Sequence, residues 1–522
     1  MVGSISMTYL LAMAVILRFV LCLGWQLPSS SYKKAAFEMA AGDLAEDCAN
    51  APALVNAHPD YYAAYNLLGL CATKQGEIKK AESFFRKSLE LNPEFIDARI
   101  NLAVNLAGQG RNQAAILQLK DLLRVDPRNV TALYNLGQIE HLRGDYKQAT
   151  EHLRLANALA PGDTQVSMAL ANSLIQSGQV GPAQELIART IETQSDRRVL
   201  IAVGLLALRA NMEEMAQRSL EKAVRLEPKD VGQVLKLARI ATDQKAYKVV
   251  HALLNVTEES GKDSAEWNAL QGYAEYKLDN PAKALEHMRR AIELNPKAEE
   301  YYLKIAELML FYKSQEPAIA YLEAGLKELP DSAILQYALG VCYMAGRVDQ
   351  KAARMHLEAA LKLQPDFWSA LAALAMLFKN AKDLTGLRDT ADRLIQLNPQ
   401  SYEGYYYKAL ALQQDSTTGI QDADDEQAQQ LLEKSIRLGP NFADSHVALG
   451  RLFAKRGNIP KAIAQFERGI DLNPESAEPY YYLGMAFRKV GEKERAAQAF
   501  SQFQELRAKE PQGNLVMFQI AR

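Results

Sequence analysis

The residues best suited to chemistry are seven histidines and a few glycine-rich segments, and none of them stands in a catalytic pattern. The histidines form no HExxH zinc motif, and no serine occurs in a GxSxG elbow. Gly108-Gln-Gly110 lacks a third glycine and a preceding strand, and Gly261-Lys262 lacks the upstream glycine of a phosphate loop. The sequence therefore predicts no catalytic residue, no cofactor and no enzyme activity.

Carboxylates are concentrated in one insertion, Asp415 to Glu426, which superficially resembles a calcium loop. It lacks the glycine that an EF-hand requires at the sixth position after Asp422. We therefore predict a flexible acidic loop over 415–427 and no metal site.

Four cysteines, Cys22, Cys48, Cys71 and Cys342, form no CxxC pair and have no zinc spacing. In an exported chain Cys48 and Cys71 are candidates for one disulfide on neighbouring helices. Two small buried thiols are the favoured interpretation at this point. Cys342 has no obvious partner.

Prolines recur at a period of 34 residues, and this period organises the whole sequence. Two positions in the series lack the proline, and three steps deviate: one residue short before Pro228, one long before Pro365 and seven long before Pro440. The prolines of the series are Pro59, Pro93, Pro127, Pro161, Pro228, Pro296, Pro330, Pro365, Pro399, Pro440 and Pro474. Thirteen units fit between residues 60 and 508, and residues 28–59 form a further degenerate unit. No room remains for a separate catalytic domain.

Each unit contains two apolar stretches at helical spacing, separated by a glycine-containing turn such as 74–77. Small residues such as Gly69 and Ala81 recur where two helices must approach closely, and large ones such as Phe85 recur where the next unit must be filled. The proline ends the second helix because it forces the preceding residue, for example Asn92, out of helical geometry. The unit is therefore a helical hairpin that buries its apolar face by stacking.

This spacing of large, small and proline positions resembles the tetratricopeptide repeat family from residue 28 to residue 508. The resemblance implies an all-α, right-handed superhelical solenoid of about 13 to 14 stacked helix-turn-helix repeats. In this family the first helices line a concave groove, and the usual activity is binding a peptide or protein segment. Residues 509–522 would then be a C-terminal cap or tail.

Tyrosines near the starts of the units are the first candidates for peptide binding, because tyrosine combines a stiff apolar face with a polar tip. They are Tyr61, Tyr62, Tyr301, Tyr302, Tyr405, Tyr406, Tyr481 and Tyr482. The alternative is packing, since the fourth position of this repeat is an aromatic core slot. A second group is basic and suits an acidic peptide or a terminal carboxylate: Arg451, Lys455, Arg488 and Lys489. A solvated charged face is its alternative.

Asn101 and Asn135 precede the leucine of two successive first helices, in the segments NLAVNL and NLGQIE. This arrangement resembles the asparagine ladder of O-linked N-acetylglucosamine transferases, whose amides bind a peptide backbone. An asparagine amide offers both a donor and an acceptor, as an extended peptide requires. Other units carry Ala448 or Tyr482 at that slot, so we expect two rungs at most.

The amino terminus carries an apolar run from Met7 to Leu23, broken by Arg18 and followed by Gly24 and Pro28. It resembles a secretory signal peptide, and residues 1–27 are predicted to be a signal peptide or a membrane anchor. No Lys or Arg precedes the run, so a buried capping helix or a misassigned start codon, with a cytoplasmic protein, is the alternative. We expect export to the periplasm or cell envelope, or membrane attachment through residues 7–23.

The composition is that of a folded protein, with 48% apolar residues, and it excludes disorder and collagen. Lys and Arg total 60 against 62 Asp and Glu, which removes the basic field that nucleic-acid binding usually needs. The sequence thus predicts a non-enzymatic, protein-binding scaffold. A regulatory or substrate-presenting subunit of a separately encoded enzyme or secretion complex is the alternative, and a self-assembling solenoid is a third. The partner and the oligomeric state stay open.

Overall fold

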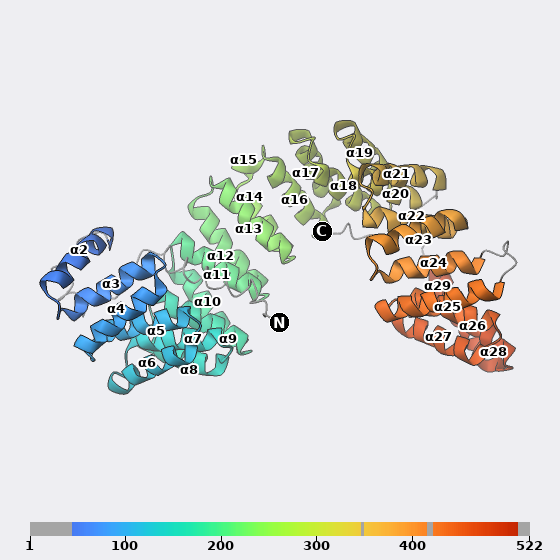
Figure 1. The fold of residues 1–522 in the computed structure, drawn as a ribbon. Helices are drawn as coiled ribbons and strands as arrows, with labels where there is room; N and C mark the ends of the chain where they lie inside the picture. Colours follow the sequence, from blue (N-terminus) through green and yellow to red (C-terminus); the bar gives the residue numbers. More distant parts are fainter. Residues whose placement is uncertain (1–43, 346–348, 415–420, 510–522) are drawn as a thin grey trace. The chain divides into compact units, whose positions relative to one another are not determined.

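A computed structural model describes residues 44–345, 349–414 and 421–509 of the chain. All regular structure in these ranges is α-helical, as Figure 1 shows. The helices group into two compact units, divided between Asp230 and Val231. The predicted signal or anchor, residues 1–27, lies outside the described residues, as does the predicted tail, residues 509–522, except for Lys509. No helix of the described ranges is long and apolar enough to cross a membrane.

The first unit consists of one helix followed by five helical hairpins. Its helices are α2 (Leu44–Ala57), α3 (Tyr62–Lys74), α4 (Ile78–Leu91), α5 (Ile96–Gly108), α6 (Asn112–Val125), α7 (Val130–Leu142), α8 (Tyr146–Leu159), α9 (Thr164–Gln176), α10 (Val180–Thr193), α11 (Arg197–Arg209) and α12 (Glu213–Leu226). Each helix packs on its hairpin partner, and each second helix also packs on the first helix of the next hairpin.

The second unit contains eight hairpins of the same kind, with a short extra helix, α15, after the first. Its helices are α13 (Val231–Asp243), α14 (Tyr247–Val256), α15 (Glu258–Gly261), α16 (Ala265–Lys277), α17 (Pro281–Leu294), α18 (Glu299–Phe311), α19 (Gln315–Glu328), α20 (Ala333–Met344), α21 (Gln350–Leu363), α22 (Trp368–Ala381), α23 (Leu384–Leu397), α24 (Tyr402–Gln414), α25 (Gln421–Leu438), α26 (Ala443–Lys455), α27 (Ile459–Leu472), α28 (Ala477–Lys489) and α29 (Lys493–Lys509). Over the described residues the two units together contain thirteen hairpins, which confirms the predicted all-α solenoid of stacked repeats.

The second helices end where the proline series predicts. Asn92, directly before Pro93, has φ −140° and ψ 93°, and Asn473, before Pro474, has φ −143° and ψ 82°. Proline disfavours helical geometry at the residue before it, which explains both extended conformations.

At the predicted close-contact positions, glycine leaves no room for a side chain between the two helices of a hairpin. A Cβ placed on Gly137 would lie 2.5 Å from Cγ of Leu153, and one on Gly450 would lie 2.6 Å from Cε1 of Phe466. Leu153 and Phe466 are themselves buried. The predicted packing slots are confirmed at these positions.

The turns within the hairpins differ from the prediction in the middle of the chain. Gly144 has φ +82°, a left-handed conformation that glycine adopts without steric cost. Five non-glycine residues take the same conformation, so the expectation of a glycine in every turn is wrong there: Asn211, Lys245, Asp279, Lys313 and Lys382. Stacking therefore holds a left-handed turn even where its residue disfavours it.

A disulfide joins Cys48 of α2 to Cys71 of α3. The favoured interpretation of two free thiols is therefore wrong, because the two Cα atoms lie 5.7 Å apart, within the range that a disulfide spans. The bond covalently ties α2 to the first complete hairpin. Cys342 is free and buried, and burial raises the pKa of its thiol to about 12.

The predicted acidic loop is helical from residue 421 onward. Gln421–Leu438 forms α25, and Ala428 and Leu432 on this helix are fully buried. The carboxylate of Asp425 is also buried and accepts a hydrogen bond of 2.8 Å from Nζ of Lys455. These anchors and the lack of Gly or Pro between 421 and 438 explain why this part of the insertion is ordered. Residues 415–420 lie outside the described residues.

Candidate protein-binding faces

The first helices line the inner side of each stack. In the first unit α3 contacts α5 and α5 contacts α7, and in the second unit α16 contacts α18 and α18 contacts α20. Among the described residues, close contact between successive second helices occurs only between α10 and α12. A stack whose first helices lie closer together curves with these helices inside. We call the exposed side of the first helices the inner face of each unit.

Each of four successive first helices in the first unit carries an asparagine; Asn66 is buried, and the other three are partly exposed. We call these four residues the amide row: Asn66 on α3, Asn101 on α5, Asn135 on α7 and Asn172 on α9. Nδ2 of Asn101 donates to Oδ1 of Asn66 at 3.0 Å, and Nδ2 of Asn135 donates to the carbonyl oxygen of Thr131 at 2.8 Å. The two predicted rungs thus belong to a longer row.

His141 orients the last amide of the row. Its Nε2 lies 3.2 Å from Nδ2 of Asn172, and its Nδ1 lies 2.8 Å from Oγ of Ser173. Burial lowers the pKa of His141, so the imidazole is neutral near pH 7 and carries one donor and one acceptor. The two contacts use both ring nitrogens and fix the position of the amide.

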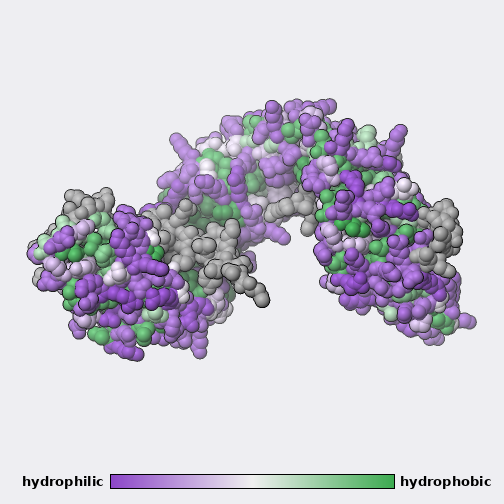
Figure 2. Space-filling view, in the orientation of Figure 1, coloured by the Kyte–Doolittle hydropathy of each residue, from purple (hydrophilic) through white to green (hydrophobic). Residues whose placement is uncertain are grey.

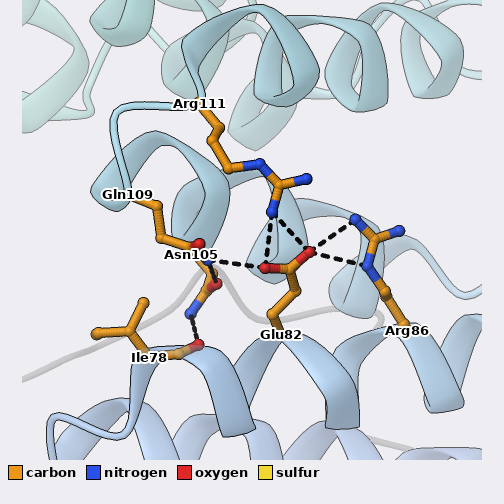
Figure 3. A network of polar contacts seen from close by, with 6 residues as sticks. All are labelled: Ile78, Glu82, Arg86, Asn105, Gln109 and Arg111. Atoms are coloured by element: carbon orange, nitrogen blue, oxygen red, sulfur yellow. Dashed lines mark hydrogen bonds and ion pairs between the residues drawn. The ribbon is translucent and has the colours of Figure 1, made fainter.

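A network of polar side chains holds the second hairpin against the first, as Figure 3 shows. Nδ2 of Asn105 donates to the carbonyl of Ile78 at 3.2 Å, and Nε2 of Gln109 donates to Oδ1 of Asn105 at 2.7 Å and to Oε2 of Glu82 at 2.9 Å. The same carboxylate accepts hydrogen bonds from Arg86 and Arg111. We call this network the Glu82 clasp.

The protonation of Glu82 follows from these contacts. Burial is the largest single influence and raises the pKa of Glu82, but the hydrogen bonds from Gln109, Arg86 and Arg111 together outweigh it and lower the pKa to about 2. The carboxylate therefore stays ionised over the physiological range. The clasp thus ties α4 to the end of α5, the helix that carries Asn101.

The four predicted basic residues do not form one positive surface. Nη1 of Arg451 lies 3.5 Å from Glu478, and its guanidinium lies over the ring of Tyr482 at 5.0 Å. Lys455 is paired with Asp425, while Nη2 of Arg488 lies 3.1 Å from the sulfur of Met485. Carboxylates thus compensate two of the four charges, and Arg488 and Lys489 remain on the exposed end of α28.

The predicted tyrosines divide into packing and exposed residues. Tyr405 and Tyr406 are buried at 6% and 4% exposure, and the hydroxyl of Tyr405 donates to the carbonyl of Pro399. Tyr482 stacks on Phe466 with 5.8 Å between ring centroids, whereas Tyr481 is 40% exposed. Packing therefore accounts for Tyr405 and Tyr406, and Tyr481 is the residue of this set whose ring is open to a partner.

Sequence profiles described as tetratricopeptide repeat match residues 62–95, 100–164, 140–206, 268–298 and 424–469. A further profile, described as TPR repeat, matches residues 450–491. These segments coincide with the helical hairpins. The chain contains tetratricopeptide repeats.

Curated relatives are similar to this tetratricopeptide repeat chain at low identity. Protein O-mannosyl-transferase TMTC3 of Homo sapiens is 24% identical over 332 residues, which cover 62% of this chain and 34% of that protein. UDP-N-acetylglucosamine--peptide N-acetylglucosaminyltransferase of Giardia intestinalis is 27% identical over 128 residues, which cover 24% of this chain and 9% of that protein. The chain thus spans about a third or less of these two relatives.

Two solved structures are similar to the chain at low identity and low TM-score. A structure of Naa15/Naa10 bound to HypK-THB has a TM-score of 0.40 and 18% identity, covering 85% of this chain and 68% of that one. The APC/C hetero-tetramer Cut9-Hcn1 has a TM-score of 0.37 and 13% identity, covering 89% and 97%.

Sequence reasoning missed Asn66, Asn172 and the Glu82 clasp. Asn66 lies 35 residues before Asn101, so the row departs from the period of 34 by one residue and a search at identical slots does not find it. Arg86 is four residues from Glu82 on the same helix, but the partners that join Glu82 to the next hairpin, Gln109 and Arg111, are 27 and 29 residues away, so no signal in the sequence marks the clasp. Within the described ranges, no group of three His, Cys, Asp or Glu side chains is placed to hold a metal ion.

Proposed function

We propose that the chain is a non-enzymatic scaffold that binds extended protein segments along its inner faces. The amide row of the first unit carries this proposal. Among the described residues, Oδ1 of Asn101, Asn135 and Asn172 accepts no hydrogen bond, and all three side chains are partly exposed. An extended segment presents N–H and C=O groups that amides on successive helices can bind.

Apolar contact supports the same face. Val104 lies one helical turn from Asn101 on α5 and is 47% exposed. An amide beside an exposed aliphatic side chain suits a segment that contributes both backbone groups and an apolar side chain. Elsewhere polar side chains cover much of the visible surface, as Figure 2 shows.

Photo-crosslinking tests this proposal directly. A photoreactive amino acid replaces Val104 on the inner face in one variant, and Leu117 on the second helix α6, 52% exposed, in the matched control. We expect protein adducts from the native source at position 104, few at position 117, and loss of the adducts when Asn101 and Asn135 are changed to Ala. Equal labelling at both positions would contradict a binding role of the inner face.

We further propose export or membrane attachment through residues 7–23. The disulfide between Cys48 and Cys71 supports it, because such bonds persist in oxidising compartments and are rare in the cytosol. We expect the mature chain either to begin near Trp25 or to be retained in a membrane fraction. Full-length, uncleaved protein found only in the soluble cytoplasm would refute this proposal.

A second candidate is a regulatory or substrate-presenting subunit of a separately encoded enzyme. The names of the two relatives, an O-mannosyl-transferase and an N-acetylglucosaminyltransferase, favour it. A transferase that co-purifies with the crosslinked chain in fixed proportion would support this role. Sugar transfer by the purified chain alone would instead contradict the non-enzymatic proposal.

A further inference from the structure

Five aromatic rings form a continuous cluster at one end of the first helices in the second unit. The ring centroids of Tyr247 and Tyr273 are 5.9 Å apart, and those of Tyr273 and Tyr276 are 6.1 Å apart. Tyr276 lies 5.4 Å from Phe311 and 6.5 Å from Tyr312. We call these five residues, which come from α14, α16 and α18, the aromatic patch.

Packing explains only part of the patch. Tyr276 is buried with Ala284 and Leu308, and Tyr273 and Tyr312 pack against this small core. Phe311 is 52% exposed, however, and is absent from that core. A large apolar ring that is half in water at the end of a first helix contributes little to the stack, so it is available to a partner.

Two lysines lie over the rings of the patch. Nζ of Lys277 is 4.2 Å from the centroid of Tyr276 and 5.0 Å from that of Tyr273, and Nζ of Lys304 is 5.6 Å from the centroid of Tyr273. Ring faces attract ammonium groups and hold them in place. The patch therefore combines flat apolar surfaces with positioned positive charges.

The charges at the patch are not fully compensated by its own carboxylates. Lys277 pairs with Glu307 at 3.4 Å, and Asp279 accepts the hydroxyl of Tyr312 at 3.0 Å. No described carboxylate lies within ion-pair distance of Lys304. An acidic group of a partner would therefore find an ammonium that is already positioned and not neutralised.

We infer that the aromatic patch binds a protein segment in which an acidic side chain stands beside an aromatic or aliphatic one. This inference rests on the proposed function and adds the partner's chemistry. The acidic side chain pairs with Lys304, and its apolar neighbour covers Phe311. Glu307 and Asp279 next to the rings repel a polyanion, which favours a peptide over a nucleic acid.

Selection from a library tests this inference. Random dodecapeptides on phage are selected on the immobilised full chain, and we expect enrichment of sequences with Asp or Glu within three residues of an aromatic or aliphatic residue. Synthetic copies should bind Phe311→Ser/Lys304→Gln at least about tenfold more weakly than wild type. Phe311→Trp/Lys304→Arg, which keeps both the ring and the charge, should retain binding.

A matched control separates the patch from general surface effects. Met355→Ser/Lys351→Gln removes an exposed apolar side chain and an exposed lysine from α21, a second helix. It should bind the selected peptides like wild type, and both double variants should melt like wild type. A lower melting temperature of the patch variant alone would assign these side chains to the fold and overturn the inference.

The remaining outcomes of these binding experiments show which kind of molecule binds the aromatic patch. Selected peptides that bind the patch variant unchanged but lose affinity when Asn101 and Asn135 are changed to Ala would overturn the patch and leave the scaffold proposal standing. Loss of self-association in the patch variant would instead make the occupant a second copy. Binding of a fluorescent oligouridylate that depends on Phe311 would make it a nucleic acid. If no peptide is enriched, the patch inference fails, and crosslinking at position 104 still tests the scaffold.

Discussion

The inner faces of the two units offer different chemistry on the same helical framework. The first unit presents the amide row from Asn66 to Asn172, in which Asn101 donates to Asn66, Asn135 donates to the carbonyl of Thr131, and Asn172 contacts His141. The second unit presents the aromatic patch, whose outermost ring is Phe311, together with Lys277 and Lys304. Amides can bind any extended backbone, whereas rings and ammonium groups select particular side chains.

This difference suggests a division of labour in recognition. Backbone binding by the first unit would be tolerant of sequence, and side-chain binding by the second would be selective. A repeat architecture permits such a division because each hairpin contacts only its neighbours, so the exposed residues of one hairpin can change without disturbing a distant one. The two units can also be compared by the interactions that stabilise each of them.

The largest expected effect concerns the disulfide, which is confined to the first unit. Changing Cys48 and Cys71 to Ala should cost about 3 kcal/mol, because the bond closes a loop of 23 residues and restricts the unfolded chain. Hydrogen exchange should rise in α2 and α3 and stay unchanged in the second unit. A reducing agent should reproduce this change in wild type and have no effect on the double variant. Unchanged exchange in both proteins would show that the bond is not formed in solution.

The next effect compares two close contacts between paired helices. Gly137→Leu should cost about 1 to 3 kcal/mol, because even a Cβ at this position would collide with Leu153. Gly272→Leu in the second unit should cost less, because an added Cβ there would lie 3.0 Å from both the carbonyl oxygen of Ala284 and Cγ of Met288, against 2.5 Å from Leu153 at Gly137.

Denaturant midpoints measure both costs. The control is Lys87→Ala on the exposed side of α4, where a change should stay within about 0.5 kcal/mol. Equal midpoints for Gly137→Leu and Lys87→Ala would contradict the assignment of the packing slots.

Features that repeat at 34 residues were predictable, and features that join different repeats were not. The prolines located the ends of the second helices, and the small residues located contacts such as Gly137 with Leu153, because both are properties of a single hairpin. The carboxylate partners of Arg451 and Lys455 lie 27 and 30 residues away on other hairpins, at separations that the period does not indicate. Arg451 and Lys455 therefore looked free in the sequence but are paired in the structure.

The amide row was likewise only partly predictable from the period of 34 residues. Asn101 and Asn135 occupy equal slots and could be found from the sequence. Asn66 stands one position before the slot equivalent to Asn101, and Asn172 stands three positions, about one helical turn, after the slot equivalent to Asn135. A search at identical slots therefore misses both. Left-handed turns at residues such as Lys313 were equally hidden, since stacking rather than local preference imposes them.

A smaller effect concerns pH, to which two partly buried histidines of the second unit and the Glu82 clasp of the first unit should respond differently. In the second unit Nδ1 of His287 lies 3.2 Å from Oδ1 of Asn268, and Nδ1 of His356 lies 2.8 Å from Oε1 of Gln336. Burial lowers the pKa of both histidines. At His287 the carboxylates of Glu286, Glu275 and Glu258 raise the pKa in part, and Lys283 lowers it further. At His356 the carboxylate of Glu323 raises the pKa in part.

The direction in which stability changes with pH follows from these pKa shifts. The folded state favours neutral histidine, so this stabilisation is complete above about pH 6.5 and is lost as the pH falls below that value. The Glu82 clasp behaves otherwise: its contribution is complete above about pH 4.5 and is lost only as the pH falls through about 2. Between pH 7.5 and 5.5, hydrogen exchange should therefore increase around α16, α17, α20 and α21 but not around the clasp.

Replacement of the two histidines checks this assignment. His287→Gln/His356→Gln keeps an amide at each hydrogen bond but cannot be protonated. Its melting temperature should fall less than that of wild type over the same pH range, by about 2 to 4 °C. An identical fall in both proteins would assign the pH response to other groups.

The smallest effect concerns the left-handed turns, which are glycine in most hairpins of the first unit and other residues in the middle of the chain. Lys313→Gly should stabilise the second unit by about 0.5 kcal/mol, because relief of the left-handed backbone (φ +55°) exceeds the entropy that a glycine adds to the unfolded state. The reciprocal change, Gly144→Lys at φ +82°, should destabilise the first unit by about 1 kcal/mol, since open space around the glycine leaves backbone conformation as the main cost. Denaturant unfolding of both variants, with Lys87→Ala as the surface reference, measures the two values. Opposite signs would show that both units impose the same turn on residues of different preference, whereas destabilisation by Lys313→Gly would mean that the lysine side chain itself supports the turn.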